Sequence, residues 1–251
     1  EFAPGQVELT LKHKPDALRA ADDAVLYKRA AKGVALRHGI EATFMAKPWS
    51  DRAGNGFHVH LSVNDADGNN LCAAEDVEGS ELLKQAIAGM KVLLGEGMAI
   101  LAPNANSYRR FKANSYAPVA PTWGVNNRTV SLRVPAGPPK TRHVEHRVAG
   151  ADANPYLVMA VLLASAHYGI ANKLDPGPAV VGDGYAAAAK ENIRLPTHWF
   201  AAVDLFERSD ILREYLGDRF VDMFVAVKRT EQARFFEVVT ELDFDWYLRN
   251  A

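Results

Sequence analysis

The chain has 251 residues, of which 48% are hydrophobic and 24% charged, and its formal net charge is -1 at pH 7. These values are typical of a soluble globular protein with enough chain to bury a core. A net charge so close to zero gives no electrostatic reason to expect nucleic acid or an anionic membrane surface as a partner.

Cysteine content and hydropathy narrow the expected location of the protein. Cys72 is the only cysteine, so an internal disulfide is impossible and a reducing compartment, the cytoplasm, is favoured. No apolar stretch is long enough to span a bilayer, and no signal peptide is visible. The sequence opens without Met on a strand-like segment, and we expect it to continue a longer sequence.

The first fifth of the chain predicts a strand, a helix and a second strand. Residues 7–11 alternate apolar and polar side chains, which is typical of a strand. Pro15 and Asp16 open an amphipathic helical stretch that runs to about residue 38 and is closed by Gly39. Residues 41–46 predict another strand, followed by a polar loop over 47–55.

Two short strands concentrate the polar chemistry of the sequence. In residues 56–62, alternation puts His58, His60 and Ser62 on one face, opposite three apolar side chains. In residues 143–148, His143, Glu145 and Arg147 share a face in the same way. Imidazoles, a carboxylate, a hydroxyl and a guanidinium suit a divalent metal and an anionic substrate. The alternative is that these are ordinary solvent-facing positions of a half-exposed sheet.

The remaining elements predict an α+β fold. A turn cluster at 64–69 precedes a helix over 80–98, and a long basic loop follows over 102–122. A strand is expected over 128–134 and a helix from Asn154-Pro155 to about residue 174. After a loop rich in Gly and Pro, helices are expected over 199–208 and 218–240. The strands cluster before the helices without strict alternation, which favours α+β over a doubly wound sheet.

Five segments in chain order resemble the C-terminal catalytic part of glutamine synthetase and its relatives. They are EFAPGQVE (1–8), GNGFHVHLS (54–62), NSYRR (106–110), NRTVSLRVP (127–135), and VEHR (144–147) with ANPY (153–156). The resemblance covers essentially the whole chain. It implies a curved antiparallel sheet flanked by helices, with residues 1–251 forming one N-terminally incomplete catalytic domain from which the family's N-terminal β-grasp domain is absent.

The resemblance also implies a reaction and an assembly. In this family ATP activates a carboxylate as an acyl phosphate, an amine nitrogen displaces phosphate, and two divalent cations, Mg²⁺ or Mn²⁺, bridge nucleotide and substrate. Glutamate, an amine and ATP are then the small-molecule substrates. A homo-oligomer of two stacked rings is implied, with each active site completed across a subunit interface. We therefore expect the 251 residues alone not to turn over.

The matching positions suggest individual roles. Two guanidiniums suit a carboxylate or phosphate because each binds bidentately and stays charged. The metal ligands implied are Glu1 and Glu8 for one cation, and His58 and Glu145 for the other. The implied ATP contacts are His60, Ser62, Arg128, Arg133 and Lys140, and the implied glutamate contacts are Gly54, Arg110 and Arg147. The candidate catalytic residues are Arg110, Arg128, Arg133 and Tyr116.

Departures from the family pattern indicate the amine. Glutamine-forming members carry a Glu that helps bind and deprotonate ammonium where this sequence has Tyr116. A neutral phenol does not attract ammonium by charge, whereas its aromatic face suits an alkyl chain or a larger ammonium group. Asn126 and His143 each replace an Arg that family members often carry. These features resemble the γ-glutamylpolyamine branch, which joins glutamate to a polyamine such as putrescine. The alternatives are a glutamine synthetase using ammonium and a catalytically silent member with a structural or regulatory role.

Overall fold

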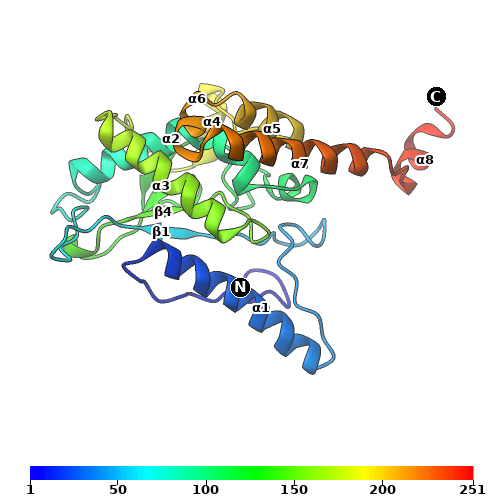
Figure 1. The fold of residues 1–251 in the computed structure, drawn as a ribbon, viewed down its shortest axis with the longest axis horizontal. Helices are drawn as coiled ribbons and strands as arrows, with labels where there is room; N and C mark the ends of the chain where they lie inside the picture. Colours follow the sequence, from blue (N-terminus) through cyan, green and yellow to red (C-terminus); the bar gives the residue numbers. More distant parts are fainter. Residues whose placement is uncertain (251) are drawn as a thin grey trace.

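The computed structural model describes residues 1–250, in which eight α-helices, four short strands and two 3-10 helices follow one another (Figure 1). The α-helices are α1 (Ala17–Arg37), α2 (Glu81–Leu101), α3 (Pro155–Ala171), α4 (Gly184–Glu191), α5 (Trp199–Glu207), α6 (Asp210–Leu216), α7 (Asp218–Phe236) and α8 (Glu241–Tyr247). The strands are β1 (Val59–Leu61), β2 (Trp123–Val125), β3 (Leu132–Val134) and β4 (Val144–His146), and the 3-10 helices are η1 (Ala105–Arg110) and η2 (Pro139–Thr141). Helices combined with a small sheet confirm the predicted α+β class.

Local side-chain chemistry fixes where the predicted helices begin. The side chain of Asp16 accepts a hydrogen bond from the backbone N–H of Arg19 and caps α1. The hydroxyl of Ser80 does the same for α2. Asn154 caps α3, and Pro155 occupies its first position, where the missing N–H costs nothing. These three helices therefore start within about two residues of the predicted positions.

The sheet has the order β1-β4-β3-β2. β1 pairs antiparallel with β4, and β4 antiparallel with β3, but β2 runs parallel to β3. The expectation of a purely antiparallel sheet is therefore wrong at this edge. The register aligns three functional positions in one row across the sheet, because His60 pairs with Glu145 and Glu145 with Arg133.

Several predicted elements differ from those observed. Residues 7–11 and 41–46 form no strand, since alternation gives a strand only where a neighbouring strand satisfies the backbone. The predicted loop over 102–122 contains η1, and the unpredicted strand β2 follows it. The predicted Gly- and Pro-rich loop contains α4, and α6 was not predicted. The last predicted helix ends at Phe236, and α8 follows as a separate helix.

The hydrophobic core lies between the sheet and the helices that cover it. In Figure 1, helices α2, α5 and α7 lie on one side of β1 and β4, and α1 lies on the other. One face of the sheet is buried in this core through Val59, Leu132 and Val144. The opposite face is left for polar side chains. In residues 1–250, no helix is long and apolar enough to cross a membrane.

Candidate active site

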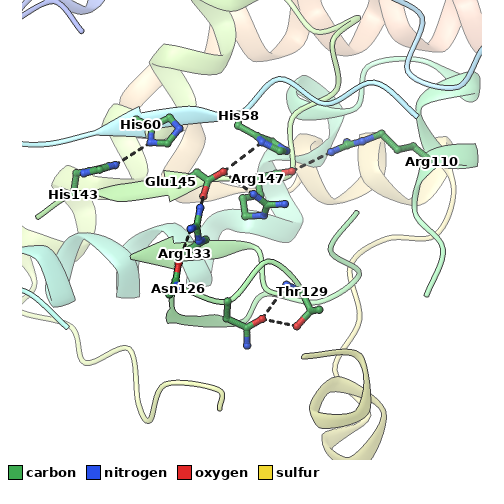
Figure 2. Close-up of polar contacts among 10 residues, drawn as sticks. His58, His60, Arg110, Asn126, Thr129, Arg133, His143, Glu145 and Arg147 are labelled. Carbon is green, nitrogen blue, oxygen red and sulfur yellow. Dashed lines mark hydrogen bonds and ion pairs between the residues drawn. The ribbon is translucent and has the colours of Figure 1, made fainter. Parts of the chain in front are cut away.

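The polar face of the sheet gathers side chains from β1, β3 and β4 and from the residues that flank them (Figure 2). Because alternate residues of a strand point the same way, Glu145 of β4 shares this face with Arg147 and His143. Arg133 of β3 and His60 of β1 lie on either side of Glu145 through the register of the sheet. The structure thus confirms the shared face predicted for each strand and unites the two faces.

Glu145 lies at the centre of this face and is only 3% exposed. It accepts hydrogen bonds from Nη1 of Arg133 at 2.8 Å and from Nη1 of Arg147 at 2.6 Å. Nδ1 of His58 lies 3.4 Å from Oε1 of Glu145. Burial alone would raise the pKa of Glu145, but Arg147 and Arg133 outweigh it and hold the pKa below its ordinary value. The carboxylate is therefore charged at neutral pH.

Two histidines of this face, His58 and His60, are neutral bases. Burial, reinforced by the charge of Arg147, lowers the pKa of His58 to about 3, so its imidazole has a free lone pair at pH 7. Burial also lowers the pKa of His60. Nδ1 of His60 lies 2.9 Å from Nε2 of His143, whose Nδ1 lies 2.7 Å from the carbonyl oxygen of Thr141. Since a carbonyl only accepts, Nδ1 of His143 donates to Thr141, and its Nε2 is the ring nitrogen that faces His60.

Two exposed carboxylates near the N-terminus, Glu1 and Glu8, form an acidic pair. A hydrogen bond between Glu1 and Glu8 raises the pKa of Glu8, and the negative charges of Glu1 and Glu145 raise it further. A divalent cation would relieve this repulsion, so the donor set fits the metal that the resemblance implies. Within residues 1–250, however, no three or more Asp, Glu, His or Cys side chains are already assembled as a metal cage. The structure brings the four predicted ligands together as two pairs.

Arg110, at the end of η1, is buried against the backbone of β4 and its extension. Its Nη1 donates to the carbonyl of Val148 at 2.7 Å and its Nη2 to that of Arg147 at 3.0 Å. Burial lowers the pKa of Arg110 to about 10, which leaves it charged at pH 7. Gly54 lies against its side chain, and a Cβ there would come 2.8 Å from Cγ of Arg110. Of the predicted glutamate contacts, Gly54 and Arg110 therefore touch each other.

A groove of about 590 Å³ opens beside β2, and its volume is within the range of small-molecule sites. Arg128 and Tyr116 both line it, and both are exposed. Tyr116 has a left-handed backbone conformation, φ 56°, which is strained for a bulky residue. Residues strained in this way cluster at functional sites of proteins. A second cavity, beside the core residue His146, measures about 10 Å³ and has no room for a substrate.

Two other predicted residues lie at the rim of the polar face. Ser62 follows directly after β1 and is half-buried. Lys140 lies in η2 with an exposed side chain. Neither makes a contact that assigns it a role.

Residue-by-residue reasoning missed two members of the polar network. Oδ1 of Asn126 accepts a hydrogen bond from Nη2 of Arg133 at 2.6 Å, and His143 contacts His60. Asn126 had been noted only as the replacement of a family Arg, whereas alternation had already grouped His143 with Glu145. That alternation was the available signal for His143, whereas no pattern indicated that Asn126 reaches β3.

Asp152 is a further residue that the sequence did not single out. It accepts hydrogen bonds from the hydroxyl of Ser107 at 2.6 Å and from the amide of Asn104 at 3.0 Å. These contacts fasten η1, which carries Arg110, to the segment after β4. No sequence pattern indicated this connection, because the partners are more than 40 residues apart.

The fold brings one buried carboxylate together with histidines and arginines on a single face of the sheet. The sequence profile described as "Glutamine synthetase, catalytic domain" matches residues 1–247. The chain therefore belongs to the glutamine synthetase family.

Some relatives within the family are amine ligases by name, and others are named glutamine synthetases. The chain is 44% identical over 251 residues to gamma-glutamylputrescine synthetase PuuA of Escherichia coli strain K12, covering 100% of this chain and 52% of that protein. It is 40% identical over 230 residues to glutamate–isopropylamine ligase of Pseudomonas sp, covering 91% and 50%. The solved structure titled "Apo GmaS without ligand" matches with a TM-score of 0.85 at 34% identity, covering 93% of this chain and 54% of that one. The chain thus spans about half the length of these relatives.

Proposed function

We propose that the protein is an ATP-dependent ligase that joins the γ-carboxylate of glutamate to an amine, preferably a polyamine such as putrescine. An oxygen of the γ-carboxylate attacks the γ-phosphorus of ATP and ADP leaves, which gives γ-glutamyl phosphate. The neutral amine nitrogen then attacks the acyl carbon, the C–O bond to phosphate breaks, and the nitrogen loses a proton. This reaction follows from family membership and from the chemistry of the polar face.

The observation that carries the proposal is the position of Glu145 between two guanidiniums and a neutral imidazole. Arg133 and Arg147 both reach the same buried carboxylate. When anionic substrates and a cation bind, Glu145 can exchange its arginine partners for the cation. The two guanidiniums are then free to bind phosphate and carboxylate oxygens in the geometry that Arg prefers.

The assigned roles remain those that the resemblance implies. We propose that His60, Ser62, Arg128, Arg133 and Lys140 contact ATP, and that Gly54, Arg110 and Arg147 hold glutamate. Arg110, Arg128 and Arg133 would stabilise charge as the phosphoryl group moves. The backbone bonds of Arg110 support a positioning role for its guanidinium at the end of the glutamate site.

We propose Mg²⁺ or Mn²⁺ as the cofactor, held by Glu1, Glu8, His58 and Glu145. Carboxylate oxygens suit both ions, and a neutral imidazole is an acceptable ligand for manganese. A bound cation would neutralise phosphate oxygens and make the γ-phosphorus accessible to a negatively charged attacking carboxylate. The low pKa of His58 and the repulsion between Glu1 and Glu8 both support these ligands.

The choice of amine rests on Tyr116 and on the relatives. Tyr116 replaces the carboxylate that would attract ammonium, and its exposed ring lines a groove with room for a carbon chain. The names of the relatives from Escherichia coli and Pseudomonas sp specify putrescine and isopropylamine. Both observations favour an alkylamine over ammonium.

We also propose that residues 1–251 are one catalytic unit that works with an N-terminal portion like that of its relatives, in a homo-oligomer of two stacked rings. Apolar side chains near the acidic pair support a covering segment, since Phe2 is 78% and Val7 81% exposed. The C-terminal helix α8 projects from the body of the molecule (Figure 1) and exposes Trp246 and Phe244. Apolar patches of this kind mark protein–protein contacts.

Phosphate release tests the proposal. The full-length enzyme is incubated with ATP, Mg²⁺ and glutamate, and 1,4-diaminobutane (putrescine), spermidine, ethanolamine and ammonium are compared as acceptors. We expect release with a di- or polyamine and little with ammonium. Strong release with ammonium would make the protein a glutamine synthetase, and the absence of phosphate release with every acceptor would favour a silent family member.

A further inference from the structure

The groove beside β2 has walls from four separate segments of the chain. Its lining includes Tyr116, the turn 125–129 after β2, the segment 179–182 and the pair Val77 and Glu78 before α2. These segments bring together an aromatic ring, several aliphatic side chains, the carboxylate of Glu78 and the guanidinium of Arg128. The groove therefore has the composition expected for a ligand with a carbon chain and a cationic group.

The aliphatic wall is held in place before any ligand binds. The backbone N–H of Val180 donates to the carbonyl of Trp123 at 2.8 Å, and the amide of Asn127 donates to the carbonyls of Val180 at 3.2 Å and Gly182 at 2.8 Å. This close approach needs Gly124, because a Cβ there would lie 2.6 Å from the Val180 oxygen. The neighbouring Val181 side chain is 95% exposed. The apolar wall is thus a fixed part of the sheet edge.

The two charged residues of the groove have different partners. Arg128 lines the groove two residues after Asn126, the hydrogen-bond partner of Arg133, and it is one of the residues that we propose to contact ATP. Glu78 comes from a different segment and lies 3.4 Å from Nζ of Lys84. Lys84 lies equally close to Asp76. Lys84 therefore keeps a carboxylate partner if Glu78 turns to another cation.

We propose that this groove holds the carbon chain of the acceptor amine and that Glu78 binds the cationic group at the far end of a di- or polyamine. This inference rests on the proposed function and specifies its substrate site. The chain lies along Tyr116 and the aliphatic wall, and the distal ammonium avoids Arg128 and pairs with Glu78. Glu78 thus determines specificity for a second amino group, and the wall determines preference for an alkyl chain.

Amines matched in length separate the two contributions. In the full-length enzyme, KM is measured for 1,4-diaminobutane, n-butylamine and ammonium, with ATP and glutamate saturating. We expect Glu78→Gln to raise KM for 1,4-diaminobutane about fivefold, the size of a partly exposed charge pair, and to leave KM for n-butylamine unchanged. Glu75→Gln makes the same charge change three residues away, outside the groove lining, and is expected to change neither value.

A second variant tests the wall without disturbing the fold. Val181→Lys adds a positive charge at an exposed position, so it is expected to raise KM for both alkylamines and to change KM for ammonium least.

Equal KM shifts for diamine and monoamine in Glu78→Gln, or no shift, would overturn the assignment. KM for ATP is measured separately with saturating amine, and a rise in it with unchanged KM for the amines would give the groove to the nucleotide instead. No turnover of the unmodified enzyme with any amine would overturn the proposed function and the groove assignment together, whereas turnover with unshifted KM values overturns the groove assignment alone.

Discussion

Glu145 shows how one residue on the polar face serves both folding and chemistry. Its carboxylate compensates the charge of the buried Arg147 and of the half-buried Arg133. A buried guanidinium without a partner is expensive, so removing the carboxylate costs more than the net value of the ion pairs. An exposed carboxylate such as Glu8 has no such structural role. The two residues therefore differ in what their loss should do.

Replacing Glu145 is predicted to reduce both stability and activity. Glu145→Gln should lower the free energy of unfolding by about 3 kcal/mol, because two guanidiniums lose their counter-charge. It should lower metal-dependent turnover by on the order of 100-fold or more, since a proposed ligand is lost. Urea unfolding and phosphate release measure the two effects. Glu8→Gln is the matched comparison, with stability within about 0.5 kcal/mol of the parent but reduced turnover. Unchanged turnover in both variants would remove these carboxylates from the metal site.

His146 predicts a specific loss of stability in acid. It is 2% exposed, and burial lowers its pKa in the folded state from an ordinary 6.5 to about 3. As the pH falls through this window the unfolded state binds the proton first, so the stability contributed by neutral His146 is complete above pH 6.5 and is lost toward pH 3. Between pH 6.5 and about pH 5 this loss amounts to about 2 kcal/mol.

Denaturant unfolding as a function of pH tests this behaviour. His146→Leu should reduce the acid-induced loss of stability by that amount, whereas His38→Gln, at an exposed position, should keep the slope of the parent. Equal slopes for the parent and His146→Leu would contradict the burial of a neutral imidazole.

At the residue scale, the sequence predicted which side chains share a face but not which of them touch. Alternation alone grouped His58 with His60, and Glu145 with Arg147. The contact between His60 and His143 depends on the register of two strands more than 80 residues apart, which no local pattern contains. The contact between Glu145 and Arg133 likewise depends on the register of β3 and β4.

At the scale of elements, α2 and α3 cross at two glycines. A Cβ on Gly89 would overlap the backbone oxygen of Ser165 and come 2.5 Å from the nitrogen of Gly169. A Cβ on Gly169 would likewise overlap the carbonyl of Gln85 and come 2.6 Å from the nitrogen of Gly89. The backbones of the two helices therefore touch directly, and α3 leads back to the strand that carries Glu145.

A methyl group at this crossing is predicted to separate the helices. Gly169→Ala should lower the free energy of unfolding by about 3 kcal/mol, because backbone atoms cannot move aside as a flexible side chain would. Gly33→Ala in α1 is the matched control, since nothing lies within 4 Å of the added Cβ and alanine favours a helix by roughly 1 kcal/mol. Urea unfolding should give opposite signs for the two variants. Similar effects of both would contradict the close crossing.

The elements that the sequence predicted well are those with their own capping signals, α1, α2 and α3. Strand β2 was missed because its central Gly124 weakens the strand pattern, and the glycine is there to let Val180 approach. Helix α4 was missed because Gly and Pro around it indicated a loop. The strand predicted over 7–11 did not form because its apolar side chains, including Val7, find no buried partner in residues 1–250.

At the scale of the whole molecule, the α7–α8 arm explains why we expect an oligomer. The first half of α7 packs into the core through Val221 and Val225, whereas the end of α7 and helix α8 carry exposed apolar side chains. The exposed side chains are Phe235, Phe236, Val238, Val239, Leu242, Phe244, Trp246, Tyr247 and Leu248. We infer that a second copy of the chain covers them.

Disrupting this arm is predicted to reduce the size of the assembly. The double variant Phe244→Glu with Trp246→Glu should give a smaller mass by light scattering, because two charges would be buried in the contact. Arg249→Ala changes an exposed polar side chain of the same arm and should keep the parent mass. An unchanged mass of the double variant would contradict the use of this arm in assembly.

The transfer of oxygen from glutamate to phosphate tests the central claim most directly. The full-length enzyme is given glutamate labelled with ¹⁸O in the γ-carboxylate, together with ATP, Mg²⁺ and 1,4-diaminobutane, and the products are analysed by mass spectrometry. An acyl phosphate intermediate predicts ¹⁸O in the released phosphate, together with a γ-glutamyl amide of the diamine. Unlabelled phosphate, or label transfer with ammonium but not with the diamine, would contradict a glutamate–amine ligase.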